Sequence, residues 1–399
     1  MGFAKRLWME EQARGWGSSD KNVCADCFED PYLKTLVQEN LATDKCDYCL
    51  QNNEKKKIAA PLDSLMKPIS SALRRYFEEP GSAGVPRDDG EWVDEERFTY
   101  TEAALLSLPL ECEEKLFRDI ASSFHNNVWI PCAHGSWLGL HPHEELLFSW
   151  RNFVETVTHR SRYFFSRENI VLLRQISTIA NSLKLVKVMR KGILLYRVRS
   201  VGSNPPNESI GYDNVGPPPE SAATAGRMNP AGISYFYLAK EKETAFAEMI
   251  DRPPCKMLLA TFKSEVDLFL LDLTHLPEFP SIFDEKKHPV REALLFVSEF
   301  AREIAKPVIK DGREHVDYVP SQIVSEYFSQ VFQGKTSEVI SGIIYPSAVR
   351  PQGKNIVLFP LWRSPATRTN EWKEILPLNS KIEQMTFSDW DKIKLILWG

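Results

Sequence analysis

The 399-residue sequence contains no apolar run long enough to span a membrane. A transmembrane helix needs about 20 consecutive, mostly apolar residues, and no stretch of this chain approaches that length. The N-terminal residues MGFAKRLWMEEQARGW also lack the apolar core of a secretory signal. Arg6 stands where an N-myristoylation signal requires serine or threonine. These absences predict a cytoplasmic protein that is not anchored to a membrane.

The sequence also lacks the excess of positive charge that is typical of nucleic-acid-binding domains. Its formal net charge is −5, so only a local basic patch would leave such binding open. Internal repeats and low-complexity tracts are absent as well. Hydrophobic residues make up 43% and charged residues 26%, which is ordinary for a globular protein that buries a core. The length predicts two or three domains.

Cysteine is scarce, but four of the seven cysteines form two C-x2-C pairs separated by 18 residues. This spacing is typical of a four-thiolate zinc site, in which each pair turns two thiolates toward one tetrahedral metal. The alternative is four free cysteines, but in a reducing cytosol the pattern favours a metal, and it disfavours disulfides. A closed four-thiolate site has no open position for a substrate, so we predict a structural Zn²⁺. Its ligands would be Cys24, Cys27, Cys46 and Cys49.

The spacing of apolar residues predicts a multi-domain α+β protein. We expect a zinc module over 1–55, a helical domain over 56–190, a mixed α/β domain over 191–365 and a C-terminal extension over 366–399. Helical periodicity predicts helices over 61–77, 110–124, 142–165, 168–189, 289–305 and 321–332. Runs rich in β-branched and aromatic residues predict strands over 193–200, 233–239, 256–264, 268–273, 342–346, 355–359 and 394–398.

Two groups in the helical region could carry chemistry. Arg118 and His125 are seven residues apart, which on a helix would place them on nearly one face. An arginine, six residues and a histidine form the motif of HEPN ribonucleases, although solvated helices match so short a pattern by chance. Cys132 with the histidines of the CAHGSWLGLHPH connection fits no familiar metal template, so we interpret them as loop or interface residues. Those histidines are His134, His141 and His143.

The stretch GRMNPAGISYFYLAKEKETAFAEM, with the strand before it, brings together an unusual set of polar residues. Arg197 lies in the upstream strand, and Arg227 follows a glycine in a loop, where a guanidinium can bind phosphate oxygens in pairs. Tyr235 and Tyr237 alternate along a strand and should share one face. Glu248 follows on the apolar side of a short helix, where a carboxylate must be paired or bound to a ligand. Both a ligand site and a structural Arg–Glu pair fit this pattern.

These elements resemble the RES domain, over residues 193–360. The family pattern has a strand ending in arginine, a Gly-Arg-Trp-Asn-Pro turn, a strand ending Tyr-Leu, a helix with glutamate and a late Pro-Ser element. The matching residues are Tyr196-Arg197, Gly226-Arg227-Met228-Asn229-Pro230, Tyr237-Leu238-Ala239, Ala247-Glu248 and Tyr345-Pro346-Ser347. Met228 departs from the pattern, since the family usually has tryptophan there. The preceding part, with its cysteines, looks like the HEPN-like domain that precedes some RES domains.

The resemblance implies a fold related to ADP-ribosyltransferases and an enzyme that degrades NAD⁺. It implies cleavage of the nicotinamide–ribose bond, with phosphate or water as acceptor. Arg197 and Arg227 would hold the diphosphate, Tyr237 would stack on the nicotinamide side, and Glu248 would stabilise the charge on the ribose. Asn229 would also bind NAD⁺. The serine of the site would be Ser347 or Ser321, and the sequence leaves both open.

RES domains typically act as toxins restrained by a partner protein. The resemblance therefore implies an antitoxin or regulatory partner, and the long N-terminal part suggests oligomerisation, sensing or a role in phage defence. Nucleic acid is an unexpected ligand for the RES region. The sequence is also compatible with two alternatives: an RNA-binding or RNA-cleaving HEPN-type protein that depends on Arg118 and His125, and an inactive NAD⁺ sensor.

Overall fold

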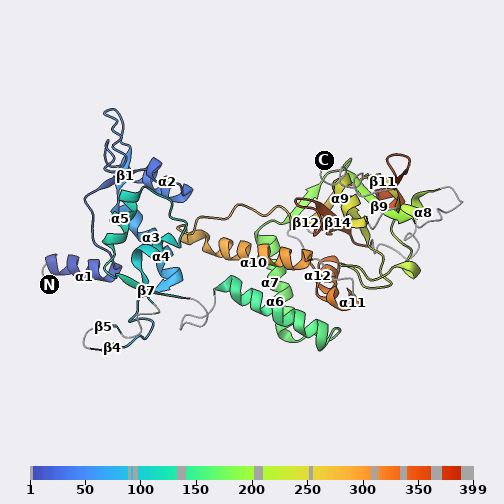
Figure 1. Cartoon of the computed structure of the whole chain (residues 1–399), viewed down its shortest axis with the longest axis horizontal. Helices are drawn as coiled ribbons and strands as arrows, with labels where there is room; N and C mark the ends of the chain where they lie inside the picture. The colour runs from blue at the N-terminus through green and yellow to red at the C-terminus, as the bar shows by residue number, and fades with distance from the viewer. Residues whose placement is uncertain are drawn as a thin grey trace. The chain divides into compact units, whose positions relative to one another are not determined.

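The chain forms two compact units in a computed structural model (Figure 1). The structure describes residues 3–88, 91–92, 98–132, 141–201, 210–250, 255–306, 312, 314–332, 339–360 and 371–387. The first unit comprises Met1–Pro142 with Glu278–Glu292, and the second comprises His143–Pro277 with Ala293–Gly399. This division differs from the boundaries expected from the sequence, because the helices that begin at 142 and 167 belong to the second unit.

The first unit is mainly helical, with short strand pairs. Its helices are α1 (Phe3–Arg14), α2 (Pro31–Glu39), α3 (Asp63–Tyr76), α4 (Thr101–Leu106) and α5 (Glu114–Ser123). Its strands are β1 (Asn22–Cys24), β2 (Ala59–Pro61), β3 (Phe77–Glu78), β4 (Arg87–Asp88), β5 (Glu91–Trp92), β6 (Thr99–Tyr100) and β7 (Val128–Pro131). Strands β1 and β2 pair antiparallel, as do β4 and β5, and β7 lies between β3 and β6.

The core of the first unit is built on α3 and α5, as the helical periodicity predicts. On α3, Leu65, Ile69 and Leu73 are completely buried although Pro68 lies inside the helix. On α5, Leu116 and Ile120 are completely buried on one face. Helix formation at these places follows from the apolar stripe, which is shielded from water when the helices pack.

A segment from far along the chain completes this core. Residues 278–292 belong to the first unit, and the side chains of Ile282 and Phe283 are buried among its apolar residues. Arg75 on α3 forms an ion pair of 2.5 Å with the buried Glu292, which fixes the end of the segment. This arrangement could not be predicted from the sequence, because a loop with two prolines such as 277–281 is compatible with many positions.

The second unit is a mixed sheet with helices. The sheet has the strand order β15-β11-β9-β10-β14-β13-β12-β8, in which β12 and β13 are parallel and the other neighbours antiparallel. Its strands are β8 (Val186–Met189), β9 (Leu194–Val201), β10 (Phe236–Ala239), β11 (Cys255–Lys263), β12 (Leu268–Asp272), β13 (Gly342–Pro346), β14 (Lys354–Leu358) and β15 (Glu383–Phe387). The predicted α+β class is confirmed.

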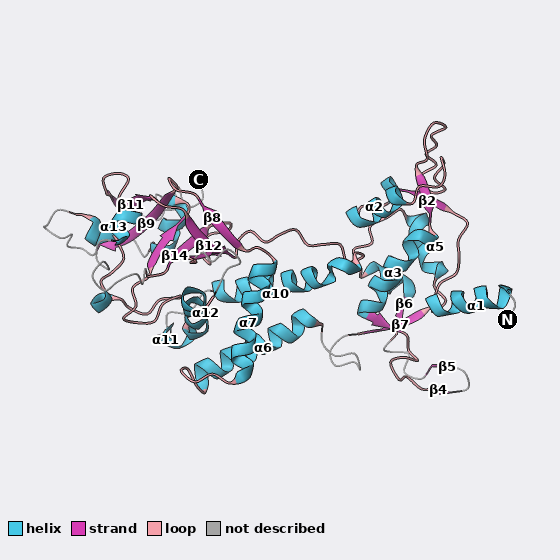
Figure 2. Ribbon diagram, turned by 180° about the vertical axis from the view of Figure 1, so that it is seen from behind, coloured by secondary structure: helices cyan, strands magenta, loops and turns pink. Residues whose placement is uncertain are grey.

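The helices of this unit cover the sheet unequally. They are α6 (Pro142–His159), α7 (Arg167–Ser182), α8 (Tyr212–Val215), α9 (Lys242–Met249), α10 (His288–Ala305), α11 (Glu314–Asp317), α12 (Val319–Gln330) and α13 (Glu371–Ile375). Helices α6, α7, α10 and α12 gather on one side of the strands, as Figure 2 shows, and pack against Val357 and Ile343. On the opposite face, Trp372 of α13 and Tyr212 of α8 pack against Phe236 and Phe262.

Two predicted elements differ from the structure in where they begin or end, and a third is not tested by it. The helix expected over 168–189 ends at Ser182, because Lys184 adopts a left-handed backbone (φ 53°) and β8 then pairs with β12. The strand expected from 233 begins at Phe236, so Tyr235 precedes it. The strand expected over 394–398 lies outside the described residues. No helix in the described ranges is both long and apolar enough to cross a membrane.

Candidate active site

The turn Gly226–Pro230 is organised by its own asparagine. The buried Asn229 amide donates to the carbonyls of Thr224, Pro230 and Ile233 at 2.9–3.0 Å. Its Oδ1 atom accepts a hydrogen bond of 2.7 Å from the Tyr237 hydroxyl, which in turn accepts from the backbone N–H of Met228 at 2.9 Å. These bonds occupy both the Asn229 side chain and the Tyr237 hydroxyl within the turn.

Glycine is required at position 226 because of close packing in this turn. A Cβ atom there would approach Asn229 Oδ1 to 2.6 Å and the Tyr237 hydroxyl to 2.8 Å. Met228, which stands where the family usually has tryptophan, is buried in the core between the sheet and its helices. The swap therefore changes core packing and leaves the polar groups of the turn in place.

Two side chains of helix α12 donate hydrogen bonds to the backbone of the same turn. The buried Ser321 hydroxyl donates to the carbonyl of Arg227 at 2.5 Å. Gln322 donates from its amide to the carbonyls of Gly226 at 2.8 Å and Asn229 at 2.9 Å. Of the two serines that the sequence left open, Ser321 thus holds the backbone of the arginine turn. Gln322 escaped the sequence analysis, although a buried glutamine on an apolar helix is a signal of such a role.

Arg227 reaches across to the C-terminal end of α10. Its Nη1 atom donates to the carbonyls of Ile304 at 2.8 Å and Lys306 at 2.6 Å, and its guanidinium lies 5.6 Å from the centre of the Tyr318 ring. Carbonyls at a helix C-terminus lack partners within the helix and carry partial negative charge, so a cation is favourable there. A guanidinium has five N–H donors, and within the described structure only Nη1 is hydrogen-bonded, so the other nitrogens remain able to bind an anion.

Glu248 is the acceptor at the centre of a small polar group. Its Oε1 atom accepts hydrogen bonds from the Ser347 hydroxyl at 2.7 Å and from the Asn355 amide at 2.5 Å. Ser347 Oγ is itself held by the backbone N–H groups of Val349 and Arg350 at 3.3 and 3.1 Å. The expectation that Glu248 lies on a buried, apolar side of its helix is wrong, because the residue is solvent-exposed in the last turn of the short helix α9.

Asn355 is the residue of this group that the sequence analysis missed. It is buried on β14, where it lies opposite Ala239 of β10 and Tyr345 of β13. The signal was present, since an asparagine at the start of the apolar run NIVLF is unusual for a central strand. Its partner could not be inferred, because the contact with Glu248 depends on the register of three strands.

Tyr345 connects the glutamate with the arginine turn. The side chain is buried, and burial raises the pKa of its hydroxyl well above the usual value. Tyr237 and Glu248 also raise the pKa of Tyr345, whereas the positive charge of Arg227 lowers it. Tyr345 lies opposite Asn355 of β14 in the sheet, and Asn355 donates to Glu248.

Arg197 lies apart from this group. Its Nη1 atom donates to the carbonyl of Gly216 at 2.9 Å, and its guanidinium lies 5.3 Å from the centre of the Phe236 ring. Burial lowers the pKa of Arg197, and the positive charge of Arg199 lowers it further, to about 9. The Arg197 guanidinium therefore stays cationic at neutral pH. Among the described residues no carboxylate forms an ion pair with it, which leaves its charge uncompensated.

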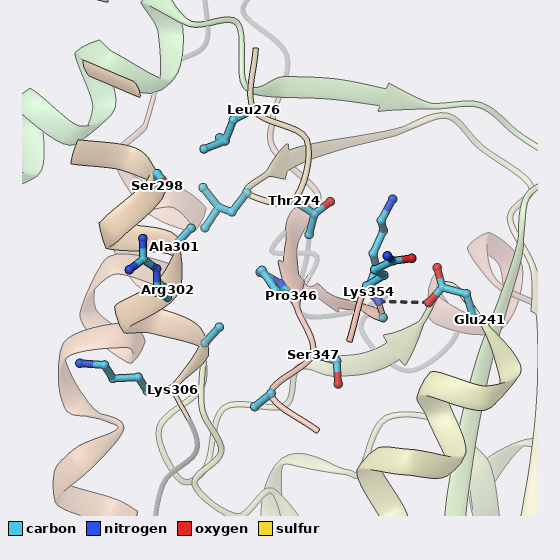
Figure 3. A pocket seen from close by; sticks show the side chains of 15 residues that line it. Glu241, Thr274, Leu276, Ser298, Ala301, Arg302, Lys306, Pro346, Ser347 and Lys354 are labelled. Atoms are coloured by element: carbon cyan, nitrogen blue, oxygen red, sulfur yellow. Dashed lines mark hydrogen bonds between the residues drawn. The ribbon is translucent and has the colours of Figure 1, made fainter. Parts of the chain in front are cut away.

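A cavity of about 880 Å³ borders the glutamate group (Figure 3). It lies between the end of α10, the chain after β12, and the connection from β13 to β14, and Ser347 is part of its wall. The other polar side chains that line it are Glu241, Thr274, Ser298, Arg302, Lys306, Gln352 and Lys354. The size is that of a pocket for a small molecule, and Ser347 joins it to Glu248.

The four predicted zinc ligands meet in the first unit. The sulfur atoms of Cys24, Cys27, Cys46 and Cys49 all lie within 4.8 Å of one another. Neighbouring sulfurs are separated by 3.4, 3.6 and 3.7 Å, close to the roughly 3.8 Å between thiolates around a tetrahedral zinc. Three of the four side chains are buried. The buried four-cysteine cluster is thus consistent with a structural zinc site.

The other groups proposed from the sequence do not form sites in the described structure. Arg118 and His125 do not share a helix, because α5 ends at Ser123 and the backbone N–H of His125 bonds to Gly15. Arg118 is exposed and pairs with Glu114 on its own helix.

Of the predicted cysteine–histidine group, His134 lies outside the described residues, and Cys132 is buried without a metal-ligand cluster in the described part of the chain. His141 packs against the Tyr76 ring at 5.3 Å between ring centres, and His143 joins no such cluster within that part either.

Comparison with known protein families agrees with this geometry. Residues 39–170 match the family described as HEPN/RES N-terminal domain 1, and residues 194–378 match the RES domain. No curated protein matches the chain. The second match contains the arginine turn, Tyr237, Glu248, Ser347 and Asn355, while the first begins between the two cysteine pairs. The chain therefore carries a RES domain preceded by a HEPN/RES N-terminal domain 1.

Proposed function

We propose that the protein degrades NAD⁺ by cleaving the bond between nicotinamide and ribose. The observation that carries the proposal is the group of Glu248, Ser347 and Asn355 beside a cavity of small-molecule size. The match of residues 194–378 to the RES domain supports it, since the resemblance to that family implies NAD⁺ degradation. The exposed carboxylate can accept a substrate directly, because nothing on α9 covers it in the described structure.

For this reaction the protein mainly has to place charged groups around the substrate. When the bond from the ribose C1 to the nicotinamide nitrogen breaks, its electron pair moves to the ring and neutralises the positive charge there. Positive charge then develops on the ribose, as in glycoside hydrolysis. A carboxylate held at this point stabilises the transition state more than the ground state. An oxygen of phosphate or water then bonds to C1, and water releases one proton.

Glu248 is suited to this role because its two oxygens differ. Oε1 accepts from both Ser347 and Asn355, so the carboxylate is fixed in orientation. Oε2 has no hydrogen bond within the described structure, and in our proposal it faces the ribose. We assign Ser347, and not Ser321, to the reacting end of the substrate, because Ser347 touches Glu248 whereas Ser321 bonds only to backbone carbonyls.

The arginines supply the positive charge that a diphosphate requires. Arg227 is anchored through one nitrogen to the end of α10, and its remaining donors are free to bind phosphate oxygens. Arg197 carries an uncompensated charge, and within the described structure its one hydrogen-bond acceptor is the carbonyl of Gly216. The Tyr237 ring, whose hydroxyl is held in the turn, would stack on the nicotinamide side.

The cellular role follows from the reaction. Loss of NAD⁺ stops growth, so we propose that the protein acts as a toxin, or in defence against phage, and that a partner protein restrains it. For the first unit we propose that Zn²⁺ binds the four cysteines and stabilises the fold, which the sulfur separations of 3.4–3.7 Å support.

Wild-type protein is expected to release nicotinamide from NAD⁺ in solution. The measurement is chromatography of nicotinamide and the ribose product, in matched buffers with and without inorganic phosphate. ADP-ribose in both buffers would identify water as the acceptor, and a phosphorylated ADP-ribose in the first would identify phosphate. A folded protein that leaves NAD⁺ intact in both buffers contradicts the proposed function.

Replacing Asn355 by leucine is expected to lower kcat about tenfold to a hundredfold. Leucine has a similar volume but no donor, so Glu248 Oε1 keeps only Ser347 as its partner, and a hydrogen bond to a charged group contributes about 1.5–3 kcal/mol. The steady-state rate of nicotinamide release checks this. Asn214→Leu, in the separate turn that bonds to Gly211, is the control. A kcat within threefold of the wild type would show that Asn355 does not position Glu248.

A further inference from the structure

A chain of hydrogen bonds lies along one wall of the cavity. It starts at the buried Asp272, the last residue of β12, whose Oδ1 accepts from the Thr274 backbone and hydroxyl at 2.8 and 2.6 Å. Its Oδ2 lies 3.1 Å from His275 Nδ1, and His275 Nε2 lies 2.8 Å from Lys354 Nζ. Burial raises the pKa of Asp272, but the bonds from Thr274 and His275 outweigh it, so the pKa is lowered and the carboxylate stays ionised.

The direction of the bonds in this chain follows from Lys354. An ammonium group has three N–H donors and no acceptor, so it must donate to His275 Nε2. The proton of a neutral imidazole is then on Nδ1, where Asp272 accepts it. Asp272 thus fixes both the ring and its tautomer, and His275 in turn holds the ammonium of Lys354 at a defined place.

Lys354 differs from the other cations of the cavity. Arg302 and Lys306 each pair with a glutamate on α10, Glu299 and Glu303. Lys354 has only the imidazole as a side-chain partner, and among the described residues no carboxylate lies within ion-pair distance of it. The nearby Glu241 does not compensate it, since that carboxylate accepts from the Lys354 backbone N–H at 3.0 Å and from the Thr244 hydroxyl at 2.8 Å.

The position of this ammonium relates it to the glutamate group. Lys354, Thr274 and Ser347 line the same cavity, and Figure 3 shows the Lys354 side chain extending on the same side as Thr274. Lys354 also precedes Asn355 on β14, so one strand carries both the free cation and the donor to Glu248. A cation with unused donors in a concave site is suited to an oxyanion, and the cavity has room for a phosphate attached to a larger molecule.

We propose that Lys354, held in place by His275 and Asp272, binds a phosphate group inside this cavity. The identity of the phosphate rests on the proposed function. It is either free orthophosphate that acts as the acceptor, or the diphosphate of the dinucleotide. In both cases Lys354 is a binding residue, and His275 and Asp272 are positioning residues.

The test compares Lys354→Met with the wild type in equilibrium binding. Methionine keeps most of the length and removes the charge. Inorganic phosphate and ADP-ribose, neither of which is cleaved, are the probes, and phosphorus NMR titration measures their dissociation constants. Lys187→Met is the matched control, because Lys187 is an exposed lysine on a strand, β8, outside the cavity.

We expect Lys354→Met to weaken one probe about tenfold to a hundredfold, the effect of losing a charge-assisted hydrogen bond. Weaker phosphate binding alone identifies the acceptor site, and weaker ADP-ribose binding identifies the diphosphate site. Affinities for both probes within twofold of Lys187→Met would overturn the proposal. Because no turnover is needed, a wild type that binds a probe through Lys354 but leaves NAD⁺ intact contradicts only the proposed function.

His275 provides a second, independent variant. His275→Gln keeps an oxygen acceptor for the Lys354 ammonium, whereas His275→Leu removes it. We expect the leucine variant to lose several-fold more affinity for the same probe than the glutamine variant. Equal losses in both variants, or none, would show that the imidazole does not position Lys354.

Discussion

Replacing Glu248 by glutamine is expected to lower the rate of NAD⁺ cleavage about a hundredfold to a thousandfold, the range seen when one electrostatic stabiliser of a transition state is removed. The substitution is conservative in shape. The amide oxygen of glutamine can still accept from Ser347 and Asn355, which donate to Oε1 at 2.7 and 2.5 Å. What is lost is the negative charge, which in our proposal offsets the positive charge that develops on the ribose.

The effect should appear in kcat and leave binding almost unchanged. A charge that acts only in the transition state contributes little to the affinity for the ground state. Glu243→Gln is the matched control, since Glu243 lies in the first turn of the same helix and makes no contact with Ser347 or Asn355. An active wild type whose Glu248→Gln variant retains full kcat would remove Glu248 from the reaction.

The elements of the second unit were predictable where side-chain pattern and tertiary pairing agree. Strands β9 and β11 were expected within one residue of their ends, because both are long β-branched and aromatic runs that pair over eight positions. Strand β8 was not predicted, because Val186 also continues the helical stripe of α7. Residues 186–189 form a strand because they pair with β12. Such pairing between distant segments cannot be inferred from a single sequence.

The site was predictable in its residues but less so in their partners. The sequence indicated Arg227, Tyr237 and Glu248, and in the structure Tyr237 bonds to Asn229 of the arginine turn while Glu248 bonds to Ser347. It could not indicate that Arg227 bonds to the end of α10 or that Asn355 bonds to Glu248, because both contacts join segments more than 70 residues apart. The HEPN-type pair failed for a local reason: the chain leaves the helix at Phe124, one residue before His125.

Removing the Zn²⁺ that we propose at the four-cysteine cluster is expected to unfold the first unit. The apolar core of this unit includes Cys24, Cys27 and Cys46. Loss of the metal would remove four metal–sulfur bonds and leave buried thiols in their place. Structural zinc sites bind with about 10–16 kcal/mol, which equals or exceeds the about 5–15 kcal/mol of net stability of a whole domain. One zinc per chain by elemental analysis, and its loss in Cys46→Ser, are the first measurements.

Unfolding of this unit can be followed through its buried tryptophans, Trp16 and Trp129. A strong chelator, or Cys46→Ser, should shift tryptophan emission to the red and remove the corresponding thermal transition, and added Zn²⁺ should restore both only in the wild type. Cys112→Ser is the control, because Cys112 packs against the same core but its sulfur is not in the cluster. A Cys46→Ser variant that melts like Cys112→Ser would show that the cluster does not hold the unit together. Because Ile282 and Phe283 are buried in this core, the same loss should release residues 278–292 and expose them to protease.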